Sequence, residues 1–268
     1  MRVRFWGVRG SVPWSAEAHS AVGSNTPCVE LADEASGGHL LLDAGTGIVG
    51  CSAARPADRT THTVLLSHYH WDHVQGLPFL EACYREGQHV EILGPVFGTS
   101  GPASIETLFA PPYFPLPFDR LSSRPVISGV RPGPFEAGGF SIRSVALNHP
   151  GGSLAYRIAG SSGDLVYATD HEFGEPAEDE ALASFAAGAS AIILDAHGTP
   201  DELPAMKGWG HGSWDQCARL AARAGVGRLW LFHHKPGRSD RDVTAIERAA
   251  LALHPGARAA REGLEFTV

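Results

Sequence analysis

The sequence predicts an α/β fold, and two patterns lead to this prediction. Short apolar runs recur along the chain, and each ends in a polar residue that can bind a metal or support a metal ligand. Two amphipathic helical segments flank the last of these runs. The runs are residues 40–42 before Asp43, 64–66 before Ser67 and His68, 165–168 before Asp170, 191–194 before Asp195, and 229–232 before His233.

Each apolar run has the length and composition of a buried strand. Strands that end together at one edge of a sheet bring their terminal residues together, as ligand crevices at the carboxyl ends of strands generally do. We therefore expect the polar residues after these runs to form one common site.

The two helical segments lie in the last quarter of the chain. The first starts with a capping box from Ser213 to Gln216 and ends at Gly225, a residue that favours a helix C-terminus. The second begins near Ser239 and Asp240. Their predicted buried faces contain Cys217, Leu220, Ala221 and Ala224 in the first, and Val243, Ile246, Ala250 and Leu253 in the second.

Residues 99–134 are rich in proline, glycine and aromatic residues and show little helical or strand periodicity. We expect an inserted loop here, which either forms a lid over the site or makes an excursion on the surface. No internal repeat or linker divides the sequence. We therefore expect a single domain over residues 1–268.

The composition fits a globular protein with a full core, since the chain has 268 residues and is 43% hydrophobic. The sequence contains no apolar stretch of 18 residues, and its start lacks the apolar region of a signal peptide. These features favour a cytoplasmic protein without a membrane partner. The four cysteines are widely separated, which argues against a disulfide framework and against a thiolate zinc site.

The formal net charge of −8 argues against long nucleic acid as a partner, because binding to DNA or RNA relies on Lys and Arg that neutralise phosphates. A small phosphate ester is compatible with this charge, since bound divalent ions would dominate the local field. The sequence does not distinguish a monomer from a homodimer.

The segment His-Tyr-His-Trp-Asp-His at residues 68–73 carries the strongest functional signal. It places His68, His70, Asp72 and His73 directly after an apolar run, although only 14 of the 268 residues are histidines. His68 and His70 share one side of an extended segment, whereas Asp72 and His73 turn back from the next element toward a second position. One ion cannot easily use all four side chains, so we expect two ions.

A dinuclear site needs further nitrogen or oxygen ligands from nearby strand ends or loops. His149 follows an alternating stretch and is a candidate imidazole for the first ion, while Asp170 is the natural bridging carboxylate. His233 ends the last apolar run and is preferred over His234 as the seventh ligand. Zinc fits this His-rich set, and manganese or iron also fits.

The motif His-x-His-x-Asp-His, followed by His149, Asp170 and His233 in that order, resembles the metallo-β-lactamase fold superfamily. The resemblance implies an αββα sandwich with a dinuclear metal site at the sheet edge. Residues 5–11, 23–26, 42–47 and 208–213 are similar to the phosphodiesterase branch, which includes ribonuclease Z and the cyclic-phosphate phosphodiesterases. The sequence lacks the Lys- and Gly-rich arm with which ribonuclease Z relatives bind tRNA, which favours a smaller substrate.

Two further roles follow from the resemblance. Asp43 would orient a metal-bound histidine, in addition to forming a tight turn with the residues after it. His211 lies between two glycines, in a position that we expect to be too exposed for the core, and would lie near the scissile phosphate. There it would protonate the leaving alkoxide or stabilise phosphoryl charge. The alternative for His211 is a hydrogen bond at the start of the following helix.

The sequence therefore predicts a metal-dependent phosphodiesterase for a small phosphodiester or cyclic phosphate. The first ion would be bound by His68, His70 and His149, the second by Asp72, His73 and His233, and Asp170 would bridge them. A metal-activated hydroxide oriented by Asp72 would attack phosphorus, with His211 as the acid. Two alternatives share these ligands: hydrolysis of a carboxylic ester, thioester or lactone, and a non-enzymatic metal-binding sensor or scaffold.

Overall fold

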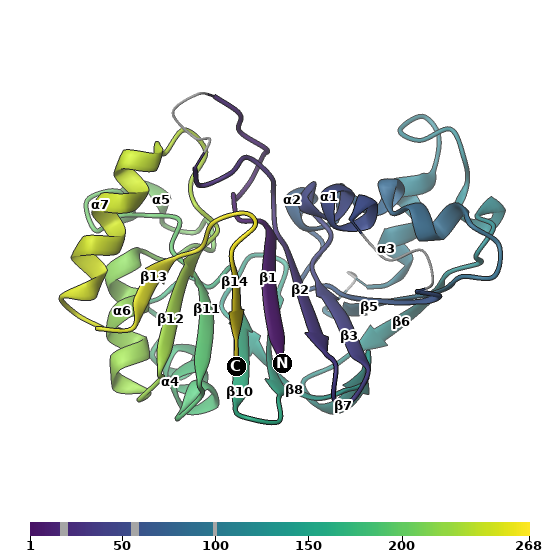
Figure 1. Cartoon of the computed structure of the whole chain (residues 1–268). Helices are drawn as coiled ribbons and strands as arrows, with labels where there is room; N and C mark the ends of the chain where they lie inside the picture. The colour runs from purple at the N-terminus through teal and green to yellow at the C-terminus, as the bar shows by residue number, and fades with distance from the viewer. Residues whose placement is uncertain (17–20, 55–58, 99–100) are drawn as a thin grey trace.

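A computed structural model describes residues 1–16, 21–54, 59–98 and 101–268 of the chain. Two β-sheets face each other at the centre, and helices cover their outer faces (Figure 1). Within the described residues each sheet contains seven strands. This is the αββα layering that the sequence predicts.

The first sheet consists, in spatial order, of β14 (Glu265–Thr267), β1 (Arg2–Gly7), β2 (Cys28–Asp33), β3 (Gly38–Leu42), β4 (Thr61–Leu65), β5 (His89–Pro95) and β6 (Val126–Val130). The second consists of β13 (Ala257–Ala259), β12 (Arg228–Phe232), β11 (Ala191–Asp195), β10 (Asp164–Ala168), β9 (Ser153–Ala159), β8 (Phe140–Leu147) and β7 (Gly133–Ala137). The terminal strands β1 and β14 pair antiparallel, which places the two chain ends side by side.

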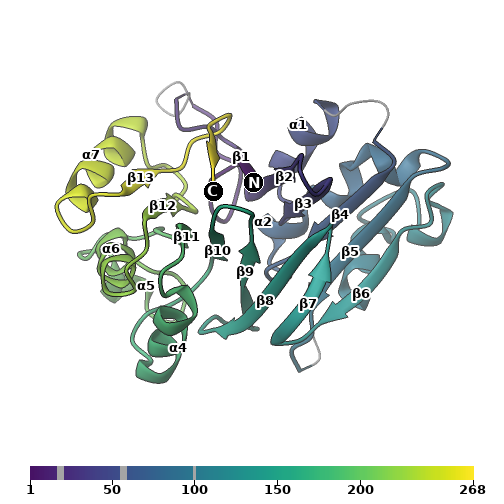
Figure 2. The same ribbon diagram turned by 60° about the horizontal axis from the view of Figure 1, so that its bottom comes forward.

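The α-helices are α1 (Gly47–Ala53), α2 (Trp71–Val74), α3 (Ala103–Glu106), α4 (Pro176–Ala186), α5 (Leu203–Met206), α6 (Trp214–Arg223) and α7 (Asp240–Leu251). Short 3-10 helices are η2 (Leu77–Phe79), η3 (Glu81–Tyr84), η4 (Thr107–Phe109) and η5 (Phe118–Arg120). Helices α4, α6 and α7 lie along the second sheet, and α1, α2 and α3 lie along the first (Figures 1 and 2). None of these helices has both the length and the apolar composition needed to cross a lipid bilayer, among the residues described.

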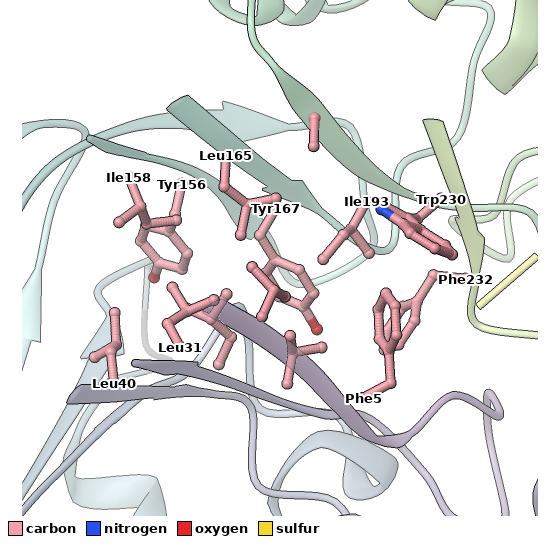
Figure 3. Packing of buried hydrophobic residues seen from close by; sticks show 14 of the residues in the cluster. Phe5, Leu31, Leu40, Tyr156, Ile158, Leu165, Tyr167, Ile193, Trp230 and Phe232 are labelled. Carbon is pink, nitrogen blue, oxygen red and sulfur yellow. The ribbon is translucent and has the colours of Figure 1, made fainter. Parts of the chain in front are cut away.

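The main hydrophobic core fills the space between the sheets. Figure 3 shows Leu31 and Leu40 of the first sheet facing Tyr156, Ile158 and other side chains of the second. These side chains are fully buried. Burial of this apolar surface on both sheets is the main force that holds them together.

Both faces of the central strands are covered, which explains why the strands read as nearly continuous apolar runs. In β12, Trp230 and Phe232 point into the core between the sheets, whereas Leu229 and Leu231 pack beneath the outer helices. A strand buried on one face would need only every second residue to be apolar.

The two amphipathic helices form where the sequence predicts them. Ser213 caps α6 and Ser239 caps α7, each with the complete capping box, and Gly225 has the left-handed φ of +64°. Leu253, predicted on the second helix, lies beyond its end and is partly buried against the same cluster.

Parallel pairing brings the carboxyl ends of the central strands to common edges. Strands β3, β4, β5 and β6 run parallel in the first sheet, and β10, β11, β12 and β13 run parallel in the second. As a result, the residues that follow β3 and β4 meet those that follow β10, β11 and β12. The expected common site lies at this meeting point.

The expectation that residues 99–134 are an inserted loop does not hold for its second part, which contains strands. Residues 126–130 form the edge strand β6 and pair with β5, and β7 begins at Gly133. As an edge strand that is buried fully only at Val130, β6 has little need of apolar alternation, which is why the pattern missed it.

The part from 101 to 125 packs Ile105, Phe109 and Leu121 into a hydrophobic cluster on the outer face of the first sheet. Among these described residues, no recorded hydrogen bond reaches the histidine cluster at the sheet edge. This packing favours the surface excursion, and a lid over the site stays a prediction. Residues 99 and 100 of the predicted loop lie outside the described residues.

Candidate metal centre

The histidine-rich motif occupies the turn between β4 and α2. His68 follows the strand, and His70 has an extended backbone (φ −61°, ψ 149°) as the N-cap of α2, whose first turn contains Asp72 and His73. The change from extended to helical backbone after His70 sends the side chains in two directions. The motif therefore supplies donors to two neighbouring positions.

The first donor group consists of His68, His70 and His149. One ring nitrogen of each lies within 4.8 Å of the others, and Nε2 of His149 is 3.0 Å from Nδ1 of His70. His68 and His149 are buried, whereas His70 is exposed. This group therefore lies on the side of the centre that opens to solvent.

The second donor group consists of Asp72, His73 and His233. Oδ2 of Asp72 lies 3.0 Å from Nε2 of His233 and 3.3 Å from Nε2 of His73. All three residues are buried. His234, the alternative to His233, turns away and contacts the carbonyl of Ala260 through Nε2 at 3.0 Å.

Asp170 lies between the two groups. Its Oδ2 is 3.2 Å from Nε2 of His73 and 3.5 Å from Nε2 of His233, and its Oδ1 is 4.0 Å from Nε2 of His68. The residue has a left-handed φ of +61°, which turns the chain sharply after β10. One carboxylate oxygen thus faces each donor group, as a bridging ligand requires.

Asp43, directly after β3, fixes the orientation of His73. Its Oδ2 accepts hydrogen bonds from Nδ1 of His73 at 2.7 Å, from the Tyr167 hydroxyl at 2.6 Å and from the Ser67 hydroxyl at 2.8 Å. The predicted contact between Asp43 and a histidine of the motif is confirmed. By binding Nδ1, Asp43 leaves Nε2 of His73 as the nitrogen that faces the centre.

The loop after β1 covers the second donor group. The backbone N–H of Ser11 donates to Oδ2 of Asp72 at 2.7 Å. A side chain on Gly10 would place its Cβ 2.4 Å from the His233 ring and 2.9 Å from Nδ1 of His197, so only glycine allows this approach.

His211 lies beside the two donor groups. Its Nδ1 is 2.8 Å from Oδ2 of Asp195 and 3.5 Å from Oδ1 of Asp170, and its ring stacks on that of His197 at a centroid distance of 4.3 Å. The sequence-based expectation that His211 is exposed is wrong, because these neighbours leave it only 9% exposed. It still lies next to the proposed ligand Asp170, through Nδ1.

The protonation states of His68, His149 and Asp170 suit metal binding. Burial lowers the pKa of His68 well below its usual range and lowers that of His149 to about 4, so both are neutral near pH 7. Burial would raise the pKa of Asp170, but the positive charges of His233 and His73 outweigh it and hold that pKa well below the usual range.

The pKa of His73 shows most clearly that the electrostatic potential at the centre is negative. Burial would lower its pKa, yet the negative charges of Asp72, Asp170 and Asp43 raise it well above the usual range. Three buried carboxylates therefore favour positive charge at this point.

Two features of the donor nitrogens fit divalent ions. Nε2 of His68 is buried without a hydrogen-bond partner among the described residues. Nε2 of His73 and Nε2 of His233 face each other at 3.3 Å, an arrangement of two lone pairs that needs a proton or a metal ion between or beside them. Nitrogen and carboxylate donors in this proportion match the preferences of zinc, and manganese or iron accepts them as well.

Asp195 and His197 also lie at the site. The sequence predicts Asp195 there as the polar residue after an apolar run but gives it no separate role, and it does not identify His197, two residues later. Together with His211 and His233 they form another close donor group. The available signal was the Asp-x-His spacing at the end of β11, where alternate residues share one side.

The amino-acid sequence is similar to a known domain family and to known enzymes. The profile of the beta-lactamase superfamily domain matches residues 39–234. A ribonuclease Z from Lacticaseibacillus casei is 27% identical over an alignment that covers 85% of each chain.

Two solved structures share the fold. The metallo-β-lactamase fold protein YhfI from Bacillus subtilis superposes with a TM-score of 0.76 at 22% identity, over 99% of this chain and 98% of that chain. A diphosphatase from the PhnP family superposes with a TM-score of 0.72 at 16% identity, over 100% and 97% of the two chains.

Proposed function

The chain belongs to the metallo-β-lactamase superfamily, and on this premise we propose that it is a dinuclear metal-dependent phosphodiesterase that acts on a small phosphodiester or cyclic phosphate. The observation that carries the proposal is the pair of three-residue donor groups on either side of Asp170, with His211 beside them. Likeness to a ribonuclease Z supports phosphate esters as the substrate class.

One ion would be held by His68, His70 and His149, the other by Asp72, His73 and His233, with Asp170 shared. Zinc is the ion we propose. Divalent ions in such sites activate a water molecule and polarise the phosphoryl oxygens.

His211 supplies the acid. Burial would lower its pKa, but the charge and hydrogen bond of Asp195 and the charges of Asp170 and Asp72 raise it to about 9. The ring is therefore protonated near pH 7. With Nδ1–H bonded to Asp195, Nε2 would carry the proton that the leaving alkoxide needs to depart.

Asp72 orients the attacking water in this proposal. One of its oxygens, Oδ2, is fixed by the Ser11 amide and lies next to His233. Two contacts on this one oxygen restrict the motion of the carboxylate, which favours attack in line with the leaving oxygen.

A direct assay tests the proposal. Metal-free protein is reconstituted with zinc or manganese, and hydrolysis of bis-p-nitrophenyl phosphate is compared with a panel of lactones and thioesters. We expect metal-dependent hydrolysis of the phosphodiester at the highest kcat/KM. A preference for the lactones or thioesters would support the ester-hydrolase alternative, and metal binding without any turnover would support a sensor or scaffold.

A further inference from the structure

Large exposed apolar side chains gather on the loops of the metal centre. Among the described residues, four of them lie on segments that carry or touch its donors, and three are tryptophans. Exposed indoles next to a site commonly contact a ligand, because an apolar surface of this size is otherwise buried. The four are Val12 and Trp14 on the loop of Ser11, Trp71 between His70 and Asp72, and Trp209 two residues before His211.

Trp71 is the first helical residue of α2 and is 59% exposed. Its neighbour His70 is the exposed member of the first donor group. Trp71 thus directly follows the exposed donor in the chain and is itself open to solvent.

Trp209 is 56% exposed but has a rigid support. It lies between Gly208 and Gly210, which have left-handed φ angles of +83° and +86°. The two oxygens of Glu172 accept hydrogen bonds from the backbone N–H groups of these glycines, at 2.8 Å and 2.7 Å. The carboxylate thus fixes the chain on both sides of the exposed indole.

Glu172 is itself tied to the loop of His149. Its N–H donates to the carbonyl of Asn148 at 2.9 Å, and Nδ2 of Asn148 donates to the carbonyl of Glu172 at 2.8 Å. These bonds connect the loop of Trp209 to the loops that carry His149 and Asp170. These bonds restrict the motion of the Trp209 segment. A side chain held in advance loses less conformational entropy when it binds a ligand, which favours a role in ligand contact.

A short chain of contacts links the two indoles. The carbonyl of Gly210 accepts a hydrogen bond from Nδ1 of His149 at 2.9 Å, and Nε2 of His149 lies 3.0 Å from Nδ1 of His70. In the sequence, Trp209 directly precedes Gly210 at one end of this series of contacts, and Trp71 directly follows His70 at the other end. In the described part of the molecule, neither indole has a recorded stacking partner.

We propose that Trp71 and Trp209 bind a planar ester group of the substrate, so that the enzyme prefers aryl or nucleoside phosphodiesters to alkyl ones. The inference rests on the proposed phosphodiesterase function. The leaving oxygen belongs near His211, which faces Asp195 and His197, whereas the indoles flank His70 and His149. The ester group that stays on phosphorus is therefore the one that reaches the indoles.

Three substrates that release the same p-nitrophenolate isolate this retained group. They are methyl p-nitrophenyl phosphate, bis-p-nitrophenyl phosphate and thymidine 5′-p-nitrophenyl phosphate. The measured quantity is the ratio of kcat/KM for each planar ester to kcat/KM for the methyl ester. Stacking of one ring on one aromatic side chain should make this ratio fall roughly 10- to 100-fold in Trp209→Ala, and similarly in Trp71→Ala.

Matched variants separate stacking from general damage. Trp209→Phe should keep most of the ratio because it retains an aromatic face. Tyr113→Ala removes a side chain that is 81% exposed on the outer excursion and should leave the ratio unchanged. Glu172→Gln should lower the ratio, whereas Glu175→Gln, which removes the same charge three residues away, should not.

Binding of products provides a readout independent of turnover. Calorimetric titration of the zinc-loaded protein with phenyl phosphate and methyl phosphate should show tighter binding of phenyl phosphate, and Trp209→Ala should abolish the difference. Kinetic ratios and binding differences that both stay within about twofold of the wild type in the Trp variants would overturn the inference. If the wild type hydrolyses none of the three esters, the proposed function fails, and the titration alone then decides whether the indoles bind planar groups.

Discussion

The two halves of the metal centre are built in different ways. The half on the first sheet comes from one continuous motif, residues 68–73, placed by the turn from β4 into α2. The half on the second sheet is assembled from His149, Asp170, His211 and His233, which lie on four separate loops. The first half is set mainly by local structure, whereas the second depends on the packing of strands and loops far apart in sequence.

The supports of the two halves differ in the same way. Asp43 of the neighbouring strand holds His73 within the first sheet, next to Ser67. In the second half, Asp195 holds His211, and Gly210 holds His149. Both halves therefore contribute metal ligands, and the second half also supplies the acid.

The largest effect is expected at Asp170, the residue between the two donor groups. Asp170→Ala removes the oxygens that face both donor groups, so the variant should release both ions and lose activity. Metal analysis after reconstitution, together with the phosphodiesterase assay, measures this. Unchanged stoichiometry and activity would show that Asp170 does not bridge.

A change at the acid of the second half, His211, should spare the metals. His211→Ala should retain full metal content while kcat falls roughly 10²- to 10⁴-fold, the range expected for loss of a general acid. The fall should be smaller for p-nitrophenyl esters than for alkyl esters, because p-nitrophenolate leaves without a proton. Equal losses on both ester types would identify His211 as a phosphate-binding residue, and no loss would favour the ester-hydrolase alternative.

Replacing the carboxylates that support a histidine in each half, Asp43 in the first and Asp195 in the second, should have different effects. Asp43→Asn weakens the hold on His73 and should lower zinc affinity or activity about 10- to 100-fold. Asp195→Asn should leave zinc affinity nearly unchanged and lower kcat on alkyl esters, as His211→Ala does. Zinc titration against a chelating dye compares the two variants, and a similar loss of affinity in both would remove the distinction between the halves.

The pH profile gives the smallest expected change. His211 acts in its protonated form and has a pKa raised to about 9, so activity on an alkyl ester should be retained below this pKa and fall as pH rises through it. Above the pKa, kcat should fall about tenfold per pH unit. The alkaline fall should be absent in His211→Ala, and its persistence there would assign it to another group.

Sequence patterns predicted the local features of the molecule. Runs such as 229–232 and the capping boxes at Ser213 and Ser239 depend on neighbouring residues only, and the structure contains them. The edge strand β6 escaped because its sequence, Val-Ile-Ser-Gly-Val, is mostly outside the core and lacks a pattern.

The site was predictable to the extent that its chemistry appears in the residue types. The seven proposed ligands stand out as His and Asp at strand ends, and they lie together in the structure. Two features were not predictable from a local pattern because they depend on contacts between loops far apart in the sequence. They are the burial of His211 and the hydrogen bonds from Gly208 and Gly210 to Glu172.

Metal content tests the central claim most directly. Protein stripped of metal, saturated with zinc and freed of excess ion should contain two zinc ions per chain, as two donor groups sharing Asp170 require. One ion or fewer per chain would contradict the dinuclear centre.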